Sequence, residues 1–455
     1  MKRLQMGFLN FLTKRKTFPH GIHPLEHKEL TAQLKIRRLP FAHRMIIPLS
    51  QHRGAPSLPI VKVGQEVVRG EPIAEAGGFV SVPMHSPVTG VVRAVNELVA
   101  TPEGPKARAI IIETYAGSRQ EVLFEGYRDI DTMSPQELVQ AVQDAGMVGL
   151  GGAAFPSHVK LLPPEGKKID TLVVNGCECE PYLTCDHRIM LEQTEKLIRG
   201  IRMVMKATGA QRAIIGVEDN KLDAVTQIRE KLPADSGISC EAVETKYPQG
   251  AEKMLITSLL GKEVPSGGIP ADIGVAVYNV GTLAQLGELI PKGRGLIERV
   301  VTLSGPGVEK PGNYLVPIGT PLRFLLEQVG AKCDAGEVIL GGPMMGMAVA
   351  SLDVAITKGV SGVVVYKPQE EDLKPRTVFP CIKCGECLSA CPVRLNPAML
   401  GQLAGVREYE LMETDYHLND CFECGCCSYV CPSNIPLTQY FRIAKAINRE
   451  AKIIG

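Results

Sequence analysis

The chain has no tryptophan, and aromatic residues make up only 5% of its 455 residues. It also has almost no net charge, because 50 lysines and arginines balance 49 aspartates and glutamates to leave +1. A nucleic-acid-binding domain usually carries a clear basic excess, so we expect no nucleic-acid partner. No apolar run reaches the roughly 20 residues that span a bilayer, so we expect no membrane-spanning helix.

The composition is that of a globular protein, with 45% hydrophobic and 22% charged residues. A chain of this length exceeds one hydrophobic core, and we expect roughly three or four domains. The first 24 residues are basic with a short apolar middle, and they lack a signal-peptide cleavage site. We expect residues 1–24 to be a disordered or partner-docked tail, with an anchor on acidic lipid as the alternative.

Cysteine is abundant, and nine of the 14 cysteines lie in two short segments near the C-terminus, eight of them in two regularly spaced runs. Both runs have the spacing C-x2-C-x2-C-x3-C-P, which is typical of bacterial ferredoxins with two [4Fe–4S] clusters. Such ligands must be reduced thiolates, which favours the cytoplasm. The eight predicted ligands are Cys381, Cys384, Cys387, Cys391, Cys421, Cys424, Cys427 and Cys431.

In this spacing the fourth cysteine of each run ligates the cluster of the other run. We therefore expect one cluster on Cys381, Cys384, Cys387 and Cys431, and the other on Cys421, Cys424, Cys427 and Cys391. Zinc is the alternative, but a zinc site needs only two C-x2-C pairs. The spare Cys426 is expected to be a packed thiol. A further metal site at Cys177, Cys179 and Cys185 is disfavoured by their irregular spacing.

The rest of the chain divides by its hydrophobic periodicity. Residues 25–125 alternate apolar and polar positions between turns and resemble the lipoyl-like sandwich of carrier domains, without the lysine that those domains modify. Residues 126–297 alternate strands with helices, which predicts a doubly wound α/β domain. Residues 298–355 form a small β-grasp-like unit, 356–378 a linker, and 379–455 a helical cluster domain. The expected strands are 171–174, 213–217 and 274–278, and the expected helices are 135–145, 192–207, 221–232, 321–329, 398–407 and 408–414.

Four motifs follow one another in the α/β region: GLGGAAFP (149–156), VNGCECEP (174–181), YPQGAE (247–252) and VYNVGT (277–282). A glycine-rich loop alone would indicate only a tight turn. In this order the motifs resemble the FMN- and NADH-binding subunit of respiratory complex I and its diaphorase relatives. Together with the lipoyl-like domain and the ferredoxin runs, the whole chain resembles the C subunit of the Rnf ion-translocating NADH:ferredoxin oxidoreductases.

This resemblance implies FMN and two [4Fe–4S] clusters as cofactors, with NADH as substrate. The glycine backbone would approach the flavin, asparagines would hydrogen-bond it, the lysine would add positive charge, and acids would accept from nucleotide hydroxyls. Solvated loops, turn caps and core packing are the alternatives for these residues. The implied cofactor-binding residues are Gly149, Gly151, Gly152, Phe155, Lys160, Asn175, Glu178, Glu180, Tyr247, Glu252 and Asn279.

The implied function is an NADH-oxidising oxidoreductase subunit that passes electrons through FMN and the clusters to a partner subunit of an ion-pumping membrane complex. The flavin would supply the two-electron to one-electron conversion, and no catalytic acid–base residue is expected. Partners would be other subunits, including a ferredoxin-like iron–sulfur subunit, with ferredoxin acting indirectly. The expected location is peripheral, on the cytoplasmic face of the inner membrane. The alternatives are a diaphorase-type subunit of a soluble hydrogenase or dehydrogenase, and a non-enzymatic docking subunit of a redox-sensor-reducing complex.

Overall fold

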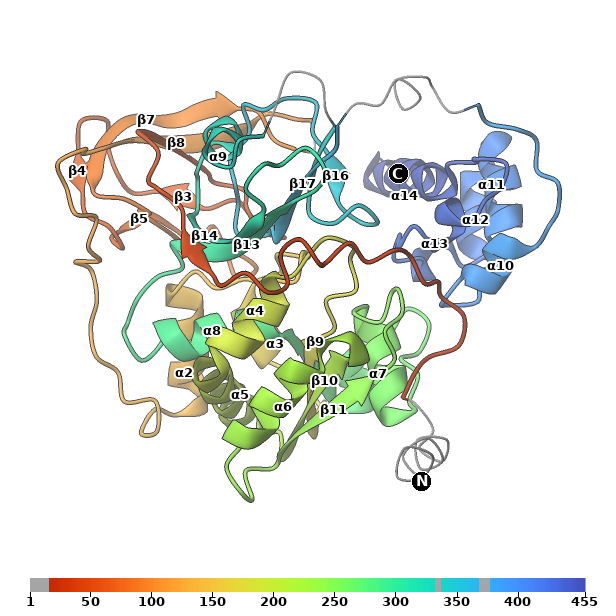
Figure 1. Ribbon diagram of the computed structural model, residues 1–455, viewed down its shortest axis with the longest axis horizontal. Coiled ribbons are helices and arrows are strands. Elements are labelled where there is room, and N and C mark those ends of the chain that lie inside the picture. Colours follow the sequence, from red (N-terminus) through yellow and green to blue (C-terminus); the bar gives the residue numbers. More distant parts are fainter. Residues whose placement is uncertain (1–15, 103, 332–336, 368–376, 455) are drawn as a thin grey trace, which may run out of the picture.

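The structure is a computed structural model that describes residues 16–102, 104–331, 337–367 and 377–454. The chain folds into four lobes joined by an N-terminal segment, drawn in red in Figure 1. In chain order they are a barrel-sandwich, an α/β domain, a β-grasp domain and a helical domain. The prediction of a multidomain α/β protein is therefore confirmed.

The first lobe contains two small sheets, as its alternating pattern predicts. One sheet has the order β2-β8-β7-β4 and the other β3-β5-β6. Met45 and Ile110 from the first sheet share a core with Ile73 from the second, which is how a sandwich buries alternate residues. The strands are β2 (Arg44–Pro48), β3 (Leu58–Pro59), β4 (Glu66–Val67), β5 (Pro72–Glu75), β6 (Met84–His85), β7 (Gly90–Val99) and β8 (Ala107–Thr114).

The second lobe contains a parallel four-stranded sheet in the order β11-β10-β9-β12. The chain runs outward from β9 to β11 and then returns to place β12 on the other side of β9. This reversal creates a topological switch point between β9 and β12, where open α/β sheets bind their ligands. The strands are β9 (Thr171–Gly176), β10 (Arg212–Glu218), β11 (Ile238–Val243) and β12 (Val275–Asn279). Three of them match the predicted strands, and β11 was not predicted.

Helices cover both faces of this sheet, as the doubly wound prediction requires. Leu172 and Val174 pack into a core that includes residues of α2, α5 and α8, whereas the intervening Val173 packs with Leu255 of α7 on the opposite face. The predicted helix 192–207 matches α5 to within two residues, whereas α4, which ends just before it, was not predicted. The helices are α2 (Pro135–Asp144), α3 (Ser157–Leu161), α4 (Cys185–Glu192), α5 (Thr194–Thr208), α6 (Leu222–Lys231), α7 (Glu252–Leu260) and α8 (Val280–Leu289).

The third lobe is one six-stranded sheet in the order β1-β14-β13-β17-β15-β16. The strands that belong to this sheet correct two predicted domain boundaries. Residues 356–378 do not begin as a linker, because the buried run 362–365 pairs with both β13 and β15. Residues 37–38 belong to this sheet instead of the lipoyl-like lobe, because they pair with β14. The elements are β1 (Arg37–Arg38), β13 (Glu298–Ser304), β14 (Gly312–Pro317), α9 (Leu322–Gln328), β15 (Val338–Leu340), β16 (Met347–Ala348) and β17 (Gly362–Val365).

The fourth lobe is helical, drawn in blue at the right of Figure 1. Its core gathers Leu400, Met412 and Phe441, one from each of three helices. The two predicted helices of this region match α11 and α12 to within a few residues. The helices are α10 (Glu386–Ala390), α11 (Pro397–Gly405), α12 (Tyr409–Thr414), α13 (Cys426–Tyr429) and α14 (Leu437–Ile454). No helix in the described ranges is both long enough and apolar enough to cross a membrane.

An N-terminal strap, residues 16–35, ties the lobes together (Figure 1). The buried Lys28 donates to the carbonyl oxygens of Glu178, Glu180 and Leu183 at 2.8, 2.8 and 2.5 Å. At the start of the strap, a ring nitrogen of His20 lies 2.9 Å from a carbonyl of the helical lobe. The predicted tail is therefore wrong for residues 16–24, which dock on this chain itself. Residues 1–15 lie outside the described ranges.

Candidate cofactor sites

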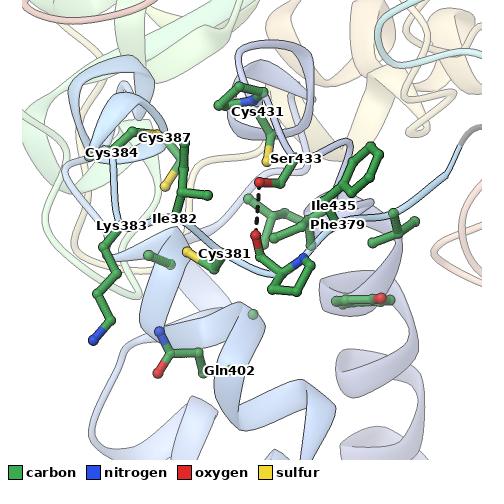
Figure 2. Close-up of a pocket in the computed structure, with 18 residues that line it drawn as sticks. Phe379, Cys381, Ile382, Lys383, Cys384, Cys387, Gln402, Cys431, Ser433 and Ile435 are labelled. Atoms are coloured by element: carbon green, nitrogen blue, oxygen red, sulfur yellow. Dashed lines mark hydrogen bonds between the residues drawn. The ribbon is translucent and has the colours of Figure 1, made fainter.

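Four cysteines line one cavity of about 230 Å³ in the helical lobe. Cys381, Cys384 and Cys387 come from the first run, whereas Cys431 ends the second run. In Figure 2, Cys431 lies across the cavity from the loop of the first run. The helices that follow the two cysteine loops, α10 and α13, contact each other, which brings each run close to the other. This is the grouping that ligation across the two runs requires, and ligation itself stays a prediction.

The other four predicted ligands gather at a second place. Burial raises the pKa of Cys427 to about 12, and nearby charge on Cys421, Cys424 and Cys391 adds to the shift. Of this group, Cys391 is again the last cysteine of the opposite run. Cys426 is fully buried beside Cys424, as expected for a spare packed thiol. Each of the two groups thus takes three cysteines from one run and one from the other.

The two groups of cysteines differ in exposure, and in both groups the thiols are widely spaced. Cys381 and Cys384 are exposed, whereas Cys391, Cys424 and Cys427 are buried. Within the described residues, no three His, Cys, Asp or Glu side chains converge closely enough to hold a single metal ion. The thiols of the first group surround a cavity instead of one point. A cubane, whose four irons each take one thiolate, fits this arrangement better than a tetrahedral zinc ion.

The glycine-rich loop of the α/β lobe is held in a closed turn by its own backbone. The N–H of Gly149 donates to the carbonyl of Phe155 at 2.8 Å, and the N–H of Leu150 donates to Oγ1 of Thr282 at 2.9 Å. Arg299 of the β-grasp lobe donates to the carbonyl of Leu150 at 3.0 Å. Thr282 ends the fourth motif but is not among the implied cofactor-binding residues, and Arg299 was missed because it does not adjoin the loop in the chain. Phe155 itself is half-buried.

The tip of this loop presents free backbone donors. The N–H groups of Gly151, Gly152 and Ala153 have no hydrogen-bond partner among the described residues, and all three residues are exposed. Gly152 has φ = +111° with open space beside its Cα, so glycine suits this position. Successive unpaired N–H groups form an anion-binding nest. The loop therefore fits the phosphate of FMN.

The nest lies at the switch point of the sheet. A Cβ on Gly151 would stand 3.2 Å from Cβ of Asn279, the last residue of β12. Asn279 in turn is in register with Asn175 near the end of β9. Three predicted residues are thus brought together at the carboxyl ends of the two strands that flank the switch point.

Both asparagines make hydrogen bonds within the protein. Asn279 caps α8 and donates to Asp186 at 2.6 Å, and Asn175 donates to the carbonyl of Gly250 at 2.8 Å. Burial and the charge of Glu178 raise the pKa of Asp186 to about 7. Asp186 was not predicted, because a lone acid in the first turn of a helix carries no sequence signal of a site.

A charged pair borders the same end of the sheet. Nζ of Lys160 lies 3.1 Å from the carboxylate of Glu252 and 3.3 Å from the carbonyl oxygen of Val277 in β12. Both side chains of the pair are more than a third exposed, so each can exchange its partner for a ligand at little cost. These two predicted residues remain candidates for binding the nucleotide.

Three other predicted residues make hydrogen bonds to other parts of the protein. The carboxylate of Glu178 is buried and accepts from the N–H groups of Asp186 and His187, so it caps α4. The carboxylate of Glu180 accepts from the N–H groups of Met344 and Met345 in the β-grasp lobe. Both carboxylates accept hydrogen bonds from backbone N–H groups of the protein itself, and their binding of a nucleotide stays a prediction.

Tyr247 is the third residue, and it faces the cysteines. Its ring is 1% exposed, and its hydroxyl donates to the carbonyl oxygen of Cys424 at 2.7 Å. It shares a small core with Ile22 of the strap and with Ala390, Cys424 and Cys426 of the helical lobe. Tyr247 therefore joins the α/β lobe to the second group of cysteines, and the prediction that it binds the nucleotide is not supported by its position.

Four known domain families match the chain, in the order of the four lobes. They are the RnfC barrel sandwich hybrid domain (residues 16–116), the Nuo51 FMN-binding domain (142–288), the SLBB domain (300–348) and the 4Fe–4S dicluster domain (380–435). The second match includes the glycine-rich loop and both switch-point asparagines. The fourth includes all eight predicted cluster ligands. The cofactor types expected from the sequence are thereby confirmed as FMN and two [4Fe–4S] clusters.

Relatives match over nearly the whole length. The C subunit of the proton-translocating ferredoxin:NAD(+) oxidoreductase complex of Clostridium ljungdahlii is 41% identical over 96% of this chain and 95% of its own. The corresponding subunit of the Na(+)-translocating complex of Acetobacterium woodii is 41% identical over 88% of this chain and 90% of its own. The equivalent subunit of the ion-translocating oxidoreductase complex of Haemophilus influenzae is 39% identical over 94% of this chain but 64% of its own length.

A solved NAD+-reducing [NiFe]-hydrogenase in the air-oxidised state has a chain that resembles the structure, with a TM-score of 0.50 and 20% identity. The likeness covers 69% of this chain and 66% of that chain, and at this identity it supports the fold alone. The relatives at about 40% identity instead cover all four lobes. The chain therefore belongs to the family of C subunits of ion-translocating ferredoxin:NAD+ oxidoreductase complexes.

Proposed function

We propose that this chain is the NADH-reacting, electron-transferring subunit of a membrane-bound ferredoxin:NAD+ oxidoreductase. FMN would lie at the switch point, with its phosphate on the N–H groups of Gly151, Gly152 and Ala153. Bound flavin supplies the conversion between the electron pair of NADH and the single electrons that iron–sulfur clusters carry. Asn175 and Asn279 would position the flavin, and the Lys160–Glu252 pair would contact the nucleotide.

The observation that carries this proposal is the contact between the α/β lobe and the second group of cysteines. The hydroxyl of Tyr247 binds the backbone of Cys424 directly, and both residues are buried. Gly425 also packs against Met344, whose N–H is held by Glu180. A rigid junction of this kind fixes the distance between a cofactor of the α/β lobe and the clusters. Electron transfer through the chain requires such a fixed distance.

The cysteine groups suggest an order for the clusters. The second group is buried at the junction, whereas the first includes the exposed Cys381 and Cys384. The buried cluster would exchange electrons with the flavin, and the exposed one would exchange them with a partner subunit. Among the alternatives, the soluble diaphorase has no support from the relatives at about 40% identity, and the docking subunit would leave the free N–H groups of the glycine-rich loop without a use.

The location would be the cytoplasmic face of the membrane, where the chain would be held by other subunits. Its proposed substrate, NADH, is a cytoplasmic solute, and thiolate ligands persist best in a reducing compartment.

The test is an anaerobic absorbance spectrum of the purified chain before and after NADH. We expect absorbance of flavin and clusters, and bleaching of both by NADH. A chain that binds FMN and iron but never reacts with NADH would refute the proposed function and favour the docking alternative.

A variant locates the flavin. Gly151→Leu should release FMN and keep the iron, because its Cβ would crowd Cβ of Asn279 at 3.2 Å and the bulky side chain would cover the nest. Gly405→Leu is the control, since a side chain at that glycine meets no atom within 4 Å. Full FMN occupancy in Gly151→Leu would show that the glycine-rich loop does not bind the flavin.

A further inference from the structure

Two loops of the barrel-sandwich lobe lie beside the glycine-rich loop. The backbone N–H of Arg53 donates to the carbonyl of Ala154 at 3.2 Å. The carbonyl of Phe79 accepts from Nε2 of His158, at the start of α3, at 2.8 Å. Phe79 belongs to the hairpin 76–83 between β5 and β6, the position at which carrier domains present their modified lysine. This chain uses that hairpin as a neighbour of the proposed flavin site.

The hairpin is firmly fixed to the α/β lobe. Val82 is fully buried in the main core of that lobe. The buried Lys358 donates to the carbonyl oxygens of Pro83 and Gly146 at 3.0 and 2.7 Å, which bridges the hairpin to the chain entering the glycine-rich loop.

The two loops also brace each other. The N–H of Ala55 donates to the carbonyl of Val80 at 3.0 Å, and a Cβ on Gly54 would clash with that same carbonyl at 1.9 Å. Nε2 of His52 lies 3.2 Å from Oγ of Ser81. The rim formed by residues 52–55 and 77–80 is therefore rigid and cannot fold away from the site.

Two side chains on this rigid rim, those of Phe79 and Arg53, make few contacts within the protein. The ring of Phe79 is 62% exposed, and its ring contact is an edge-on one with His158 at 5.9 Å. Arg53 is exposed, and its guanidinium has no hydrogen bond or ion pair to any described residue. An aromatic face and a free guanidinium are the two groups that recognise a purine base and a phosphate.

From this placement we infer that the barrel-sandwich lobe supplies the subsite for the adenosine diphosphate half of NADH. The ring of Phe79 stacks on the adenine, and the guanidinium of Arg53 pairs with the pyrophosphate. The inference rests on the proposed function, because NADH must react at the neighbouring switch point. It gives the first lobe a role in substrate binding.

The test compares two reductants with the FMN-loaded chain. Reduced nicotinamide mononucleotide has the reactive ring of NADH and lacks the adenosine half. Phe79→Ala should raise KM for NADH roughly tenfold, which corresponds to about 1.4 kcal/mol, and leave KM for the mononucleotide unchanged. Arg53→Ala should act in the same direction. Phe79→Tyr should retain the KM of the parent chain, because it keeps the aromatic face.

A binding measurement avoids turnover altogether. ADP-ribose, which carries the adenosine and pyrophosphate without nicotinamide, should bind the oxidised chain and inhibit competitively against NADH. By titration calorimetry its Kd should rise roughly tenfold in Phe79→Ala. The controls are Tyr127→Ala, an 87% exposed tyrosine whose chain neighbours bond the backbone of Pro291 and Lys292, and Arg108→Ala, an exposed arginine of β8. Both should leave KM and Kd unchanged.

The outcomes separate the two proposals. If NADH still bleaches the flavin and Phe79→Ala changes neither KM nor Kd, the subsite is refuted and the proposed function stands. If Phe79→Ala raises KM equally for both reductants, or releases FMN, the ring contacts the flavin or nicotinamide and the adenosine assignment is wrong. If the parent chain never reacts with NADH, the proposed function itself fails.

Discussion

The junction between the α/β lobe and the helical lobe can be tested by removing a single oxygen. Tyr247→Phe keeps the buried ring and deletes the hydroxyl that donates to Cys424. The core volume is nearly conserved, so the substitution should not perturb the α/β lobe itself. What it leaves behind is a buried carbonyl oxygen of Cys424 without its donor.

The magnitude follows from that unsatisfied group. Leaving one buried acceptor unpaired costs about 1–3 kcal/mol. Because the bond joins two lobes, this cost should appear as easier local opening of the cysteine loops and not as global unfolding. A loss of 1–3 kcal/mol corresponds to a roughly 5- to 150-fold increase in the equilibrium constant for opening.

Amide hydrogen exchange of the cluster-loaded chain, resolved by peptide, measures this opening. Peptides covering residues 421–431 should exchange roughly tenfold faster in Tyr247→Phe, while peptides from β9 and β10 should not change. Tyr429→Phe is the matched control, since that tyrosine lies within the measured segment of the helical lobe and is 55% exposed. Equal exchange in Tyr247→Phe and the parent chain would show that the hydroxyl does not hold the lobes together.

Three further predictions concern the clusters, the nucleotide and pH. In EPR of the reduced chain, Cys431→Ser should perturb the same cluster signal as Cys381→Ser; perturbing the signal that depends on Cys421 would refute ligation across the two runs. Glu252→Gln should raise KM for NADH and leave FMN content unchanged. An unchanged KM would show that Glu252 is a solvated surface residue that does not bind NADH. Burial lowers the pKa of Lys358 to about 7, whereas an unfolded lysine titrates near 10.4. Between these two pH values the unfolded chain therefore binds more protons than the folded chain. The free energy of unfolding, measured with urea, should therefore rise from pH 7 to pH 9. Lys358→Met should remove that rise, and an identical pH dependence in the variant and the parent chain would contradict this prediction.

The features that the sequence predicted well are those carried by local spacing. The two cysteine runs fix their loops through contacts within a few residues, and the structure brings them into the expected cross-run groups. The helix start at Ser134 is equally local, since its capping box involves only Ser134 and Glu137. The strands β9, β10 and β12 were recognised because each is a short apolar run buried on both faces.

The features that the sequence did not predict depend on distant partners. Glu178 and Glu180 look alike in a polar loop, and only the fold shows that one caps α4 and the other binds the backbone near Met344. The strand β11 is half exposed and lacks a clear apolar run, so its pattern was too weak to recognise. The sequence predicts a linker at 362–365 because a polar, proline-rich segment follows this run.

The N-terminal strap also has a consequence for the order in which the chain is built. His20 meets a residue 369 positions later, and β1 pairs with a strand of residues 312–317. During synthesis at about 5–20 residues per second, the start of the strap must therefore wait tens of seconds for its partner in the helical lobe. The closing of the strap is one of the last steps of assembly, because its contact with residue 389 needs the first cysteine run to have emerged from the ribosome. A nascent chain that pauses before that point would expose the strap's apolar side chains to chaperones and proteases.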